Sequence, residues 1–334
     1  MAKKKIKDTD YLVVSARVRA MENDLVTPER MEQLLAAHTD EEAVKLLQSF
    51  GYPELDIAHP EAMDAAIDEV RQATLDDLAS SLPDRGLLDV FHIKYDYHNA
   101  KVLLKAEALN TDGDHMLMDL GRVSAAELKE AVAGGTADLP GHLSEAVAEA
   151  REVLSTTRDP QLGDVALDKW YFRDMLETAD ATESDFLRGY VRIQLDCSNL
   201  RTLIRTLRMG KTTEFLRGVL FEGGEVGTED ILHVCANNGS GLSELYAPTR
   251  LAEAAEAGAA ALRGGLLTDF EKSCDDAVTA YLGDSRLIPF GEAPVLWYLT
   301  ARETEYTNLR ILMMGRAAGI PADVIRTRLR AVAG

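Results

Sequence analysis

The amino-acid sequence predicts an all-α protein, and two observations support this prediction. Apolar residues recur at steps of three and four, as at Met63, Ile67 and Val70, which places them on one face of a helix. The strong helix formers Ala, Leu, Glu and Arg are abundant, whereas the alternating apolar and polar runs that indicate strands are missing. We therefore expect the regular structure to be helical.

Two capping boxes indicate where individual helices begin. Thr39 is followed three residues later by Glu42, and Ser124 is followed by Glu127 in the same way. In a capping box the hydroxyl and the carboxylate satisfy backbone N–H groups at a helix N-terminus that otherwise have no partner. Each box precedes a segment with helical apolar periodicity, and residues 143–154 show this periodicity again.

The composition excludes some classes of partner. The chain has 334 residues, roughly two to three times a typical domain, so several helical domains are possible. Its 36 Lys and Arg residues against 56 Asp and Glu residues give a formal net charge of −20 at pH 7. A field of this sign repels the phosphates of nucleic acids and anionic lipid head groups. We expect no nucleic-acid partner and no direct binding to lipid.

The cysteines and the apolar runs indicate a reduced, cytosolic setting. Cys197, Cys235 and Cys274 are too far apart for a CxxC metal pair or a disulfide framework. The N-terminal segment lacks the apolar stretch of a signal peptide. The longest apolar runs, such as residues 295–299, are far shorter than the roughly 20 residues that cross a bilayer. We expect no membrane-spanning segment.

Three segments of the chain match one pattern, which reads acidic-x-x-Asn-apolar-basic-x-Leu. The copies occupy residues 96–103, 196–203 and 305–312, and their asparagines are 100 and 109 residues apart. Repeats at this spacing predict one small helical domain per copy. The acidic, asparagine and basic positions are Asp96, Asn99 and Lys101 in the first copy, Asp196, Asn199 and Arg201 in the second, and Glu305, Asn308 and Arg310 in the third.

A second helix start follows each copy, at Ser124, Thr228 and Pro321. A further start of the same kind opens the protein, where Thr27 is the expected N-cap and Pro28 occupies the first helical position. The chain thus begins inside the repeat, as it would in a closed ring of units. The three expected domains comprise residues 1–115, 116–220 and 221–334, with boundaries near 115 and 220.

Within the pattern, helical geometry places Asp96, Asn99 and Leu103 on one face. The asparagine then lies beside an apolar stripe, where it either fixes how its helix meets a neighbour or contacts another protein or a ligand. We favour the first interpretation, because buried polar groups are usually satisfied by partners within the protein.

A basic stripe runs along the same helices, roughly opposite the acidic and asparagine positions. In the first copy it also includes His98, whereas the third copy keeps only Arg310 and has Met314 where another cation could stand. These cations either pair with carboxylates on neighbouring helices or meet acidic or carbonyl-rich loops of a partner. The possible partner contacts are Lys94, Lys101, Lys105, Arg201, Arg205 and Arg208.

Residues 91–105, Phe-His-Ile-Lys-Tyr-Asp-Tyr-His-Asn-Ala-Lys-Val-Leu-Leu-Lys, resemble the C subunit of the bacterial and archaeal V-type (A-type) rotary ATPases, which is related to the d subunit of the vacuolar enzyme. Residues 11–27 resemble the N-terminal helix of that family, and the likeness covers essentially the whole chain. Cys197 departs from the pattern, since the other copies carry Tyr97 and Tyr306 at that position. This difference weakens strict threefold symmetry.

The resemblance implies a funnel of three similar helical domains without a catalytic site or cofactor. It also implies a peripheral place on the cytoplasmic side of the membrane, with one copy per complex. There the protein would connect the rotor shaft, made by the D and F subunits, to the membrane rotor ring of c/K subunits. It would transmit torque for ATP-coupled transport of H⁺ or Na⁺. We expect the isolated protein to be monomeric and to lack ATPase activity.

Signals for catalysis are weak. Residues 209–212, with Gly210 before Lys211, resemble the end of a phosphate-binding loop. Arg205 stands where the first glycine of such a loop should be, so a helix C-cap at Gly210 is the better interpretation. The aspartate pair at Asp76 lacks the third aspartate of a magnesium-binding helix, as does the pair at Asp275. His92 and His98 are six residues apart and face different ways. We propose no catalytic, cofactor-binding or metal residues.

A generic helical-repeat scaffold of the solenoid kind is the alternative function class. Solenoid units span about 33 to 47 residues, whereas the copies found here recur at about the length of a whole domain. The spacing therefore favours the rotary-ATPase connector.

Overall fold

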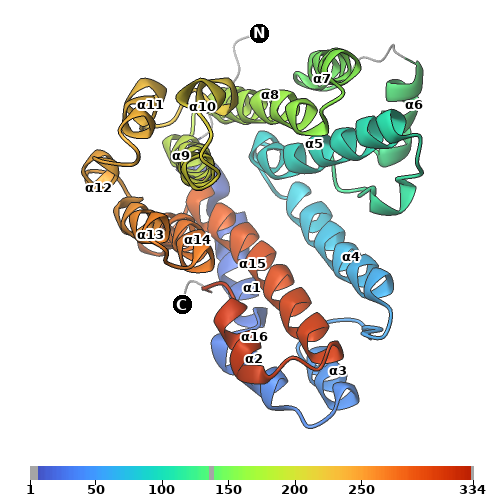
Figure 1. Ribbon diagram of the computed structural model, residues 1–334. Helices are drawn as coiled ribbons and strands as arrows, with labels where there is room; N and C mark the ends of the chain where they lie inside the picture. Colours follow the sequence, from blue (N-terminus) through green and yellow to red (C-terminus); the bar gives the residue numbers. More distant parts are fainter. Residues whose placement is uncertain (1–6, 135–138, 332–334) are drawn as a thin grey trace. The chain divides into compact units, whose positions relative to one another are not determined.

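The computed structural model describes residues 7–134 and 139–331, and within these residues every regular element is a helix (Figure 1). The predicted all-α fold class is confirmed. No helix among the described residues is long and apolar enough to cross a membrane.

The chain divides into two units, which we call unit 1 and unit 2. Unit 1 combines residues 1–83 with residues 266–334, and unit 2 comprises residues 84–265. The helices of unit 1 are α1 (Leu12–Met21), α2 (Pro28–Ala36), α3 (Asp40–Ser49), α4 (Pro60–Ala79), α14 (Leu267–Gly283), α15 (Glu292–Ala317) and α16 (Ala322–Arg328). Those of unit 2 are α5 (Gly86–Leu109), α6 (Ala125–Gly134), α7 (Leu143–Thr157), α8 (Pro160–Ala181), α9 (Asp185–Arg208), α10 (Thr213–Val219), α11 (Thr228–Ala236), α12 (Leu242–Tyr246) and α13 (Ala252–Leu262).

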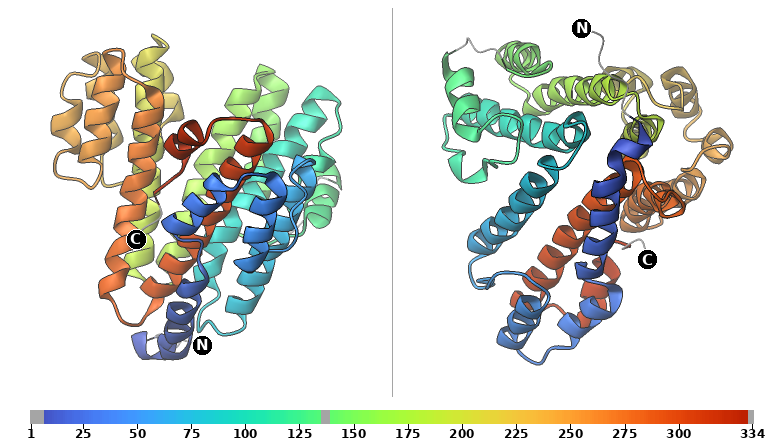
Figure 2. Two further views of the ribbon diagram at one scale, coloured as in Figure 1. Left: turned by 90° about the horizontal axis from the view of Figure 1, so that it is seen from below. Right: turned by 180° about the vertical axis from the view of Figure 1, so that it is seen from behind.

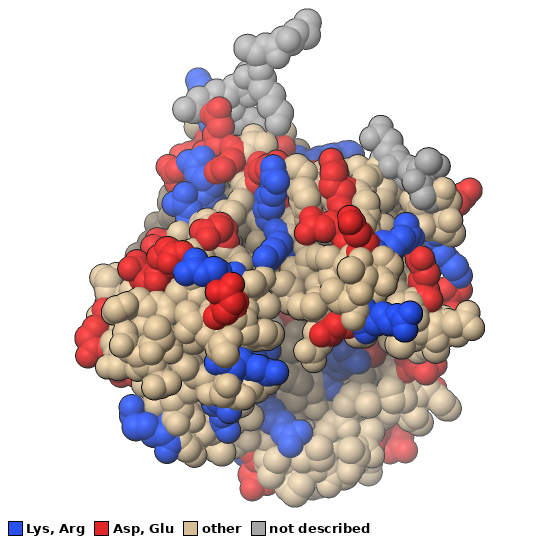
Figure 3. Space-filling view, turned by 45° about the horizontal axis from the view of Figure 1, so that its top comes forward, with Lys and Arg blue, Asp and Glu red and all other residues tan. Residues whose placement is uncertain are grey.

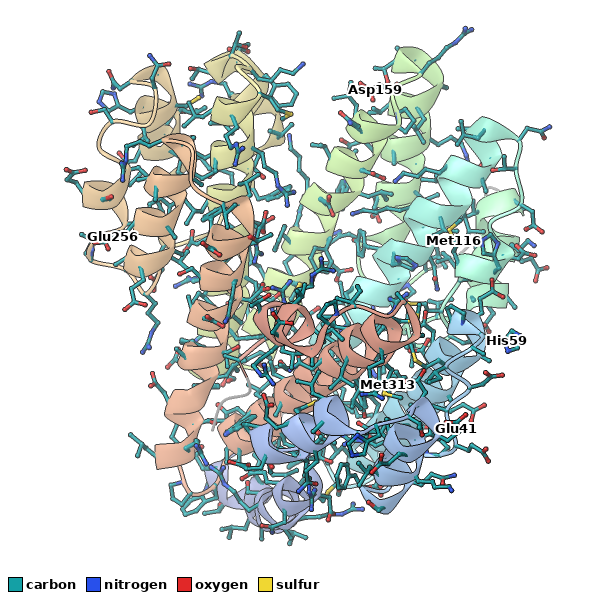
Figure 4. All side chains as sticks on the ribbon, turned by 60° about the horizontal axis from the view of Figure 1, so that its bottom comes forward. Glu41, His59, Met116, Asp159, Glu256 and Met313 are labelled. Carbon is teal, nitrogen blue, oxygen red and sulfur yellow. The ribbon has the colours of Figure 1, made fainter. Side chains whose placement is uncertain are left out.

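Unit 1 is organised around α15, which packs against α1, α2, α4, α14 and α16. The N-terminal helix α1 therefore lies beside a helix from the far end of the chain, as both views in Figure 2 show. The core joins apolar residues of α2, α3 and α4 to α15, and it includes Leu34, Leu47, Met63 and Met313. Figure 4 shows Met313 on α15, whereas Glu41 on α3 is exposed at the surface of the same unit.

Unit 2 is organised around two long helices, α5 and α9, which are largely buried like α15 of unit 1. Helix α8 packs against both of them and against α7, while α6 and α7 also cover α5. Helix α9 is further covered by α10, α11 and α13. The most buried helix of unit 1 and these two helices of unit 2 are the three that carry the acidic-x-x-Asn pattern.

The helix ends follow the predicted capping chemistry. At the start of α6 the Glu127 amide donates to the Ser124 hydroxyl and the Ser124 amide donates to the Glu127 carboxylate, each at 3.2 Å, so this capping box is formed. At α3 the Glu42 amide donates to Thr39 Oγ1, but the Glu42 carboxylate accepts from the His38 amide instead. Only the hydroxyl half of that box matches the prediction.

The segment that resembled a phosphate-binding loop joins two helices. Helix α9 ends at Arg208, and Gly210 follows in the left-handed conformation with φ at +63°. The Lys211 amide donates to the Thr206 carbonyl at 3.0 Å, which is a helix C-terminal hydrogen bond. Thr212 then caps α10 by accepting from the Phe215 amide. The interpretation of Gly210 as a helix C-cap is confirmed.

Candidate functional site

The three predicted asparagines are buried, with 0%, 0% and 1% of Asn99, Asn199 and Asn308 exposed. They project from α5, α9 and α15 respectively. A primary amide in such a place needs both a donor and an acceptor, because leaving either half unpaired costs free energy.

Each asparagine finds both partners in the backbone N–H and carbonyl of a single residue. Asn99 Nδ2 donates to the Met118 carbonyl at 2.7 Å, and the Met118 amide donates back to Asn99 Oδ1 at 2.9 Å. Asn199 forms the same pair with Phe221 at 2.8 and 2.9 Å. Asn308 forms it with Arg330 at 3.0 and 2.8 Å. Each asparagine therefore fastens the segment that follows its helix to the helix itself.

The acidic position of each copy accepts a backbone N–H from a valine. The Val123 amide donates to Asp96 at 3.3 Å, and the Val226 amide donates to Asp196 at the same distance. In the third copy the Val26 amide donates to Glu305 at 2.7 Å. Each valine lies two residues before the first residue of a helix, α6, α11 or α2. The carboxylates thus hold the start of a helix against the helix that carries the motif.

In the third copy, the valine and the helix start that the acid holds come from the N-terminal part of the chain. The sequence suggested that the helix start at Pro321 follows the third copy in the way that Ser124 follows the first. The structure instead brings Val26 and the Thr27 N-cap to Glu305, while the segment after α16 supplies Arg330 to Asn308. The additional helix start at the beginning of the sequence therefore belongs with the third copy.

The first copy neutralises its buried carboxylate with an arginine. Arg122 Nε donates to Asp96 Oδ2 at 2.7 Å, and Arg122 Nη2 donates to Asp174 Oδ2 on α8 at 2.7 Å. Burial alone would lower the pKa of Arg122, but the hydrogen bonds to the two aspartates outweigh it and raise that pKa. The arginine stays charged and joins α8 to the helix start after α5. Tyr97 adds an O–H hydrogen bond to Asp174 at 3.3 Å.

In the third copy the acid receives a cation from its own helix and a hydroxyl hydrogen bond from the segment that follows α3. Arg302, one turn before the acid on α15, contacts Glu305 at 2.5 Å and donates from Nε to the Tyr306 hydroxyl at 3.1 Å. The Tyr52 hydroxyl also donates to Glu305. Burial raises the pKa of Glu305, and the Arg302 charge opposes that shift. A buried polar network therefore surrounds this carboxylate.

The second copy has no such cation. Asp196 is 3% exposed, and among the described residues its hydrogen bonds come only from the amides of Glu225, at 2.9 Å, and Val226. The position of Arg122, one residue before the valine, is occupied by Glu225. Burial raises the pKa of Asp196 to about 6, with the Glu225 charge adding to the rise while the two amides and Arg192 oppose it. The three copies share geometry and differ in charge.

The basic positions of the first and third copies form ion pairs. Lys101 contacts Asp168 on α8 at 2.5 Å, and Lys105 contacts Asp164 on the same helix at 2.6 Å. Arg310 contacts Asp64 on α4 at 2.8 Å. In the upper part of the face in Figure 3, positive and negative side chains lie next to one another. These pairs match the interpretation in which the stripe binds carboxylates of neighbouring helices.

The remaining stripe residues differ in exposure. Lys94 is half-buried and lies 4.6 Å from the centre of the Tyr95 ring. Arg201 is half-buried, whereas Arg205 and Arg208 are exposed near the end of α9. Among these four residues, Arg205 and Arg208 are the exposed ones.

Sequence reasoning did not find Arg122, Asp174, Tyr52 or Arg302. Arg302 had a usable signal, because it precedes Glu305 by three residues and so shares its helix face. Asp174 and Tyr52 had none, since they come from other helices or loops, 77 residues from Tyr97 and 253 residues from Glu305.

These features define an all-helical protein in which three long helices each fasten a following segment and a helix start through buried polar groups. Among the described residues there is no group of three or more His, Cys, Asp or Glu that could hold a metal ion. The chain belongs to the family described as ATP synthase (C/AC39) subunit, whose model matches residues 14–328.

Named relatives agree with this family. The C subunit of the V-type sodium ATPase of Enterococcus hirae is 22% identical over 325 residues, which cover 97% of this chain and 99% of the relative. The C subunit of the A-type ATP synthase of Methanocaldococcus jannaschii is 26% identical, covering 96% of this chain and 86% of the relative. The C subunit of the V-type ATP synthase of Thermus thermophilus is 26% identical over 69% of each chain. The resemblance to the C subunit of the V-type and A-type enzymes is confirmed.

We predict that replacing Asn99 or Asn199 with Leu lowers the free energy of unfolding by about 1–3 kcal/mol, because a buried backbone N–H and carbonyl lose their partner. Urea unfolding of each variant measures the loss. The control is Asn237→Leu, at an exposed position of the same unit, which should change stability by less than about 0.5 kcal/mol. An unchanged midpoint and slope for Asn99→Leu would contradict a structural role for the amide.

Replacing Arg122 with Met should cost about 3–5 kcal/mol, because it leaves two buried carboxylates, 0% and 3% exposed at the side chain, without their cation. Arg173→Met is the matched control on α8. Its ion pair with Glu177 is more than half exposed and should contribute at most about 1 kcal/mol. Equal losses for the two variants would show that Arg122 does not act as a buried counter-ion.

Asp196 should make stability depend on pH. Its pKa of about 6 lies above the unfolded value of about 4, so the folded state binds more protons between those pH values. The stabilisation from this group is complete below about pH 4 and is lost as the pH rises through about 6. NMR titration of the Asp196 carboxyl carbon measures the pKa directly. Glu225→Gln should lower it, whereas the exposed control Glu244→Gln should leave it unchanged.

Proposed function

We propose that the protein is the central-stalk connector of a V/A-type rotary ATPase, and that it links the rotor shaft to the membrane rotor ring. The single observation that carries this proposal is membership of the C/AC39 family over residues 14–328. The Enterococcus hirae relative, which is named as the C subunit, matches over 99% of its own length. In this role the protein sits on the cytoplasmic side of the membrane as one copy per complex. Its partners are the D and F subunits of the shaft and the ring of c/K subunits.

The mechanical role is supported by the way the long helices are fastened. A connector that transmits torque must resist relative movement of its helices. Asn99, Asn199 and Asn308 each hold a backbone segment through two hydrogen bonds, and Asp96 and Glu305 are buried in ion pairs. Buried polar groups of this kind permit few alternative packings, because a shifted helix would leave them unpaired. We propose that these contacts give the stiffness that the connector needs.

The proposal includes the threefold organisation expected from the sequence. Three domains near residues 1–115, 116–220 and 221–334 would each hold one copy of the motif. The contact between Val26 and Glu305 supports the part of this proposal in which the N-terminal segment completes the last copy of the motif.

The protein itself would not hydrolyse ATP. Lys211, the one residue that resembled a phosphate-binding lysine, follows a helix C-cap and lies over the Phe215 ring, with its ammonium nitrogen 5.7 Å from the ring centre. The chemistry of ATP would belong to the A and B subunits, and the choice between H⁺ and Na⁺ would belong to the ring.

The test is assembly with the purified D–F shaft complex and with the detergent-solubilised ring from the native host. We predict that the double charge reversal Arg205→Glu and Arg208→Glu weakens one of these associations at least tenfold at low salt, because exposed cations steer and register an acidic partner. Helicity and melting should stay near the wild-type values. The matched control is Arg217→Glu on α10, an exposed arginine of the same unit that lies outside the stripe.

The possible results distinguish a failure of the connector role from a failure of the part assigned to Arg205 and Arg208. Wild-type protein that binds neither the shaft nor the ring would overturn the connector role. Wild-type binding that survives the double reversal would leave the connector role intact and assign the exposed stripe to solvation alone.

A further inference from the structure

The second copy of the motif fastens a short backbone segment, residues 221–226, which lies between α10 and α11. We call this segment the second strap. Its first residue is paired with Asn199, and its last two residues donate their amides to Asp196. The corresponding segment of the first copy, residues 118–123 between α5 and α6, is the first strap. The two straps make similar backbone contacts but are held by different side chains.

The second strap passes directly over the buried carboxylate of Asp196. The amides of Glu225 and Val226 donate to its two oxygens at 2.9 and 3.3 Å. A Cβ on Gly224 would collide with Asp196 Oδ1. A Cβ on Gly223, whose φ is +105°, would collide with a leucine side chain of α8. These two positions therefore require glycine, and the strap has two adjacent residues without a side chain that could anchor them.

The first strap has an arginine and a histidine contact in addition to its backbone contacts. Arg122 lies in the strap itself and binds both Asp96 and Asp174. The His92 ring forms a hydrogen bond with the Leu120 carbonyl at 2.6 Å. In the second strap a glutamate stands at the place of the arginine. The second strap thus closes over a carboxylate that has no ion-pair partner in the described part of the chain.

The charges nearest to Asp196 do not replace the missing cation. Burial raises the pKa of Asp196 to about 6, and the Glu225 charge adds to the rise. The two amide hydrogen bonds and the charge of Arg192, one turn earlier on α9, oppose it. The balance favours the protonated, uncharged form of the buried carboxyl more than in an aspartate exposed to water.

The helices that pack against α9 add no cation beside Asp196. Helix α8 places Phe172 and Leu176 against the strap residue Phe221, and the buried acid of α8, Asp174, is already bound by Arg122. The buried residues of α10, α11 and α13 are apolar side chains, a cysteine and a glycine. Their charged and titratable side chains are exposed, and Figure 4 labels one of them, Glu256. These exposed residues are Glu214 and Arg217 on α10, Glu229, Asp230 and His233 on α11, and Glu253 and Glu256 on α13.

We propose that the second strap is a pH-sensitive latch, which is closed over Asp196 while that carboxyl carries a proton and opens locally when the proton is lost. An uncharged carboxyl is less costly to bury without a counter-ion than a carboxylate, so loss of the proton favours the open strap, in which the group reaches water. The glycine pair lets the strap move by itself. Phe221 stays in place, because its partner Asn199 does not titrate.

This inference goes beyond the connector role and does not depend on it, because it concerns the isolated chain. In a connector, the second copy of the motif would be the one that loosens as the surrounding pH rises. The first copy would respond less. Burial raises the pKa of Asp96 too, but the hydrogen bond and the charge of Arg122 oppose that rise.

The test is hydrogen exchange of the full-length protein, followed at single amides by NMR and corrected for the effect of pH on the intrinsic exchange rate. Protection of the Glu225 and Val226 amides should fall about tenfold between about pH 5 and pH 8. This ratio follows from a pKa of about 6 in the closed strap and about 4 in the open one, since the closed strap is favoured below pH 4 and loses that advantage as the pH rises through 6. The Phe221 amide and the Val123 amide of the first strap should change less.

A variant that restores the cation tests the cause. Glu225→Arg gives the second strap the residue type of the first, and it should remove most of the loss of protection at Val226. The matched control is Glu244→Arg, the same change of charge at an exposed position of α12, which should leave the tenfold fall unchanged.

Three outcomes would overturn the latch. They are protection of the strap amides that does not depend on pH, the same fall in Glu225→Arg as in the wild type, and an equal fall at the Leu203 amide within α9, which would indicate unfolding of the whole unit instead of the strap. None of these results involves the shaft or the ring, so the latch and the connector role can fail separately.

Discussion

The double hydrogen bond between a buried asparagine and one backbone residue is the interaction on which the rest of the fold depends. It places the segment after each long helix, at Met118, Phe221 or Arg330, beside the middle of that helix. No other common uncharged side chain except glutamine offers a donor and an acceptor side by side, and glutamine is longer by one methylene. Because the amide is fully buried, any slip of the segment would leave four polar atoms unpaired.

The acidic residue one turn earlier extends this arrangement to the next helix. Its carboxylate accepts a hydrogen bond from the amide of a valine just before an N-cap, and so holds the start of the next helix. The negative charge is also attracted to the positive end of that helix dipole. In the third copy the valine comes from the beginning of the chain, and 279 residues separate the two groups. A contact of this sequence separation joins the two chain segments of unit 1 into one folding unit.

The three copies keep the same hydrogen bonds while differing in charge. Asp96 is neutralised by an arginine that follows it in sequence, and Glu305 by an arginine that precedes it, whereas Asp196 has a second acid beside it. Burial of a carboxylate is costly, and an arginine that follows the acid or one that precedes it can offset part of that cost. The geometry of the backbone contacts is therefore constrained more strongly than the origin of the counter-ion. The basic stripe varies in the same way, because the third copy has the uncharged Met314 where the other copies have Lys105 and Arg205.

By itself the sequence determined the helical class, the capping box at Ser124, the C-cap at Gly210 and the three acidic-x-x-Asn positions. These follow from local periodicity and from hydrogen bonds over three or four residues, which a linear pattern records. Only the tertiary structure decided that Val26 belongs to Glu305, that Arg122 bridges Asp96 to Asp174, and that Lys101 pairs with Asp168. Such contacts join groups tens to hundreds of residues apart, and their energies depend on burial and distance that exist only once the helices have packed.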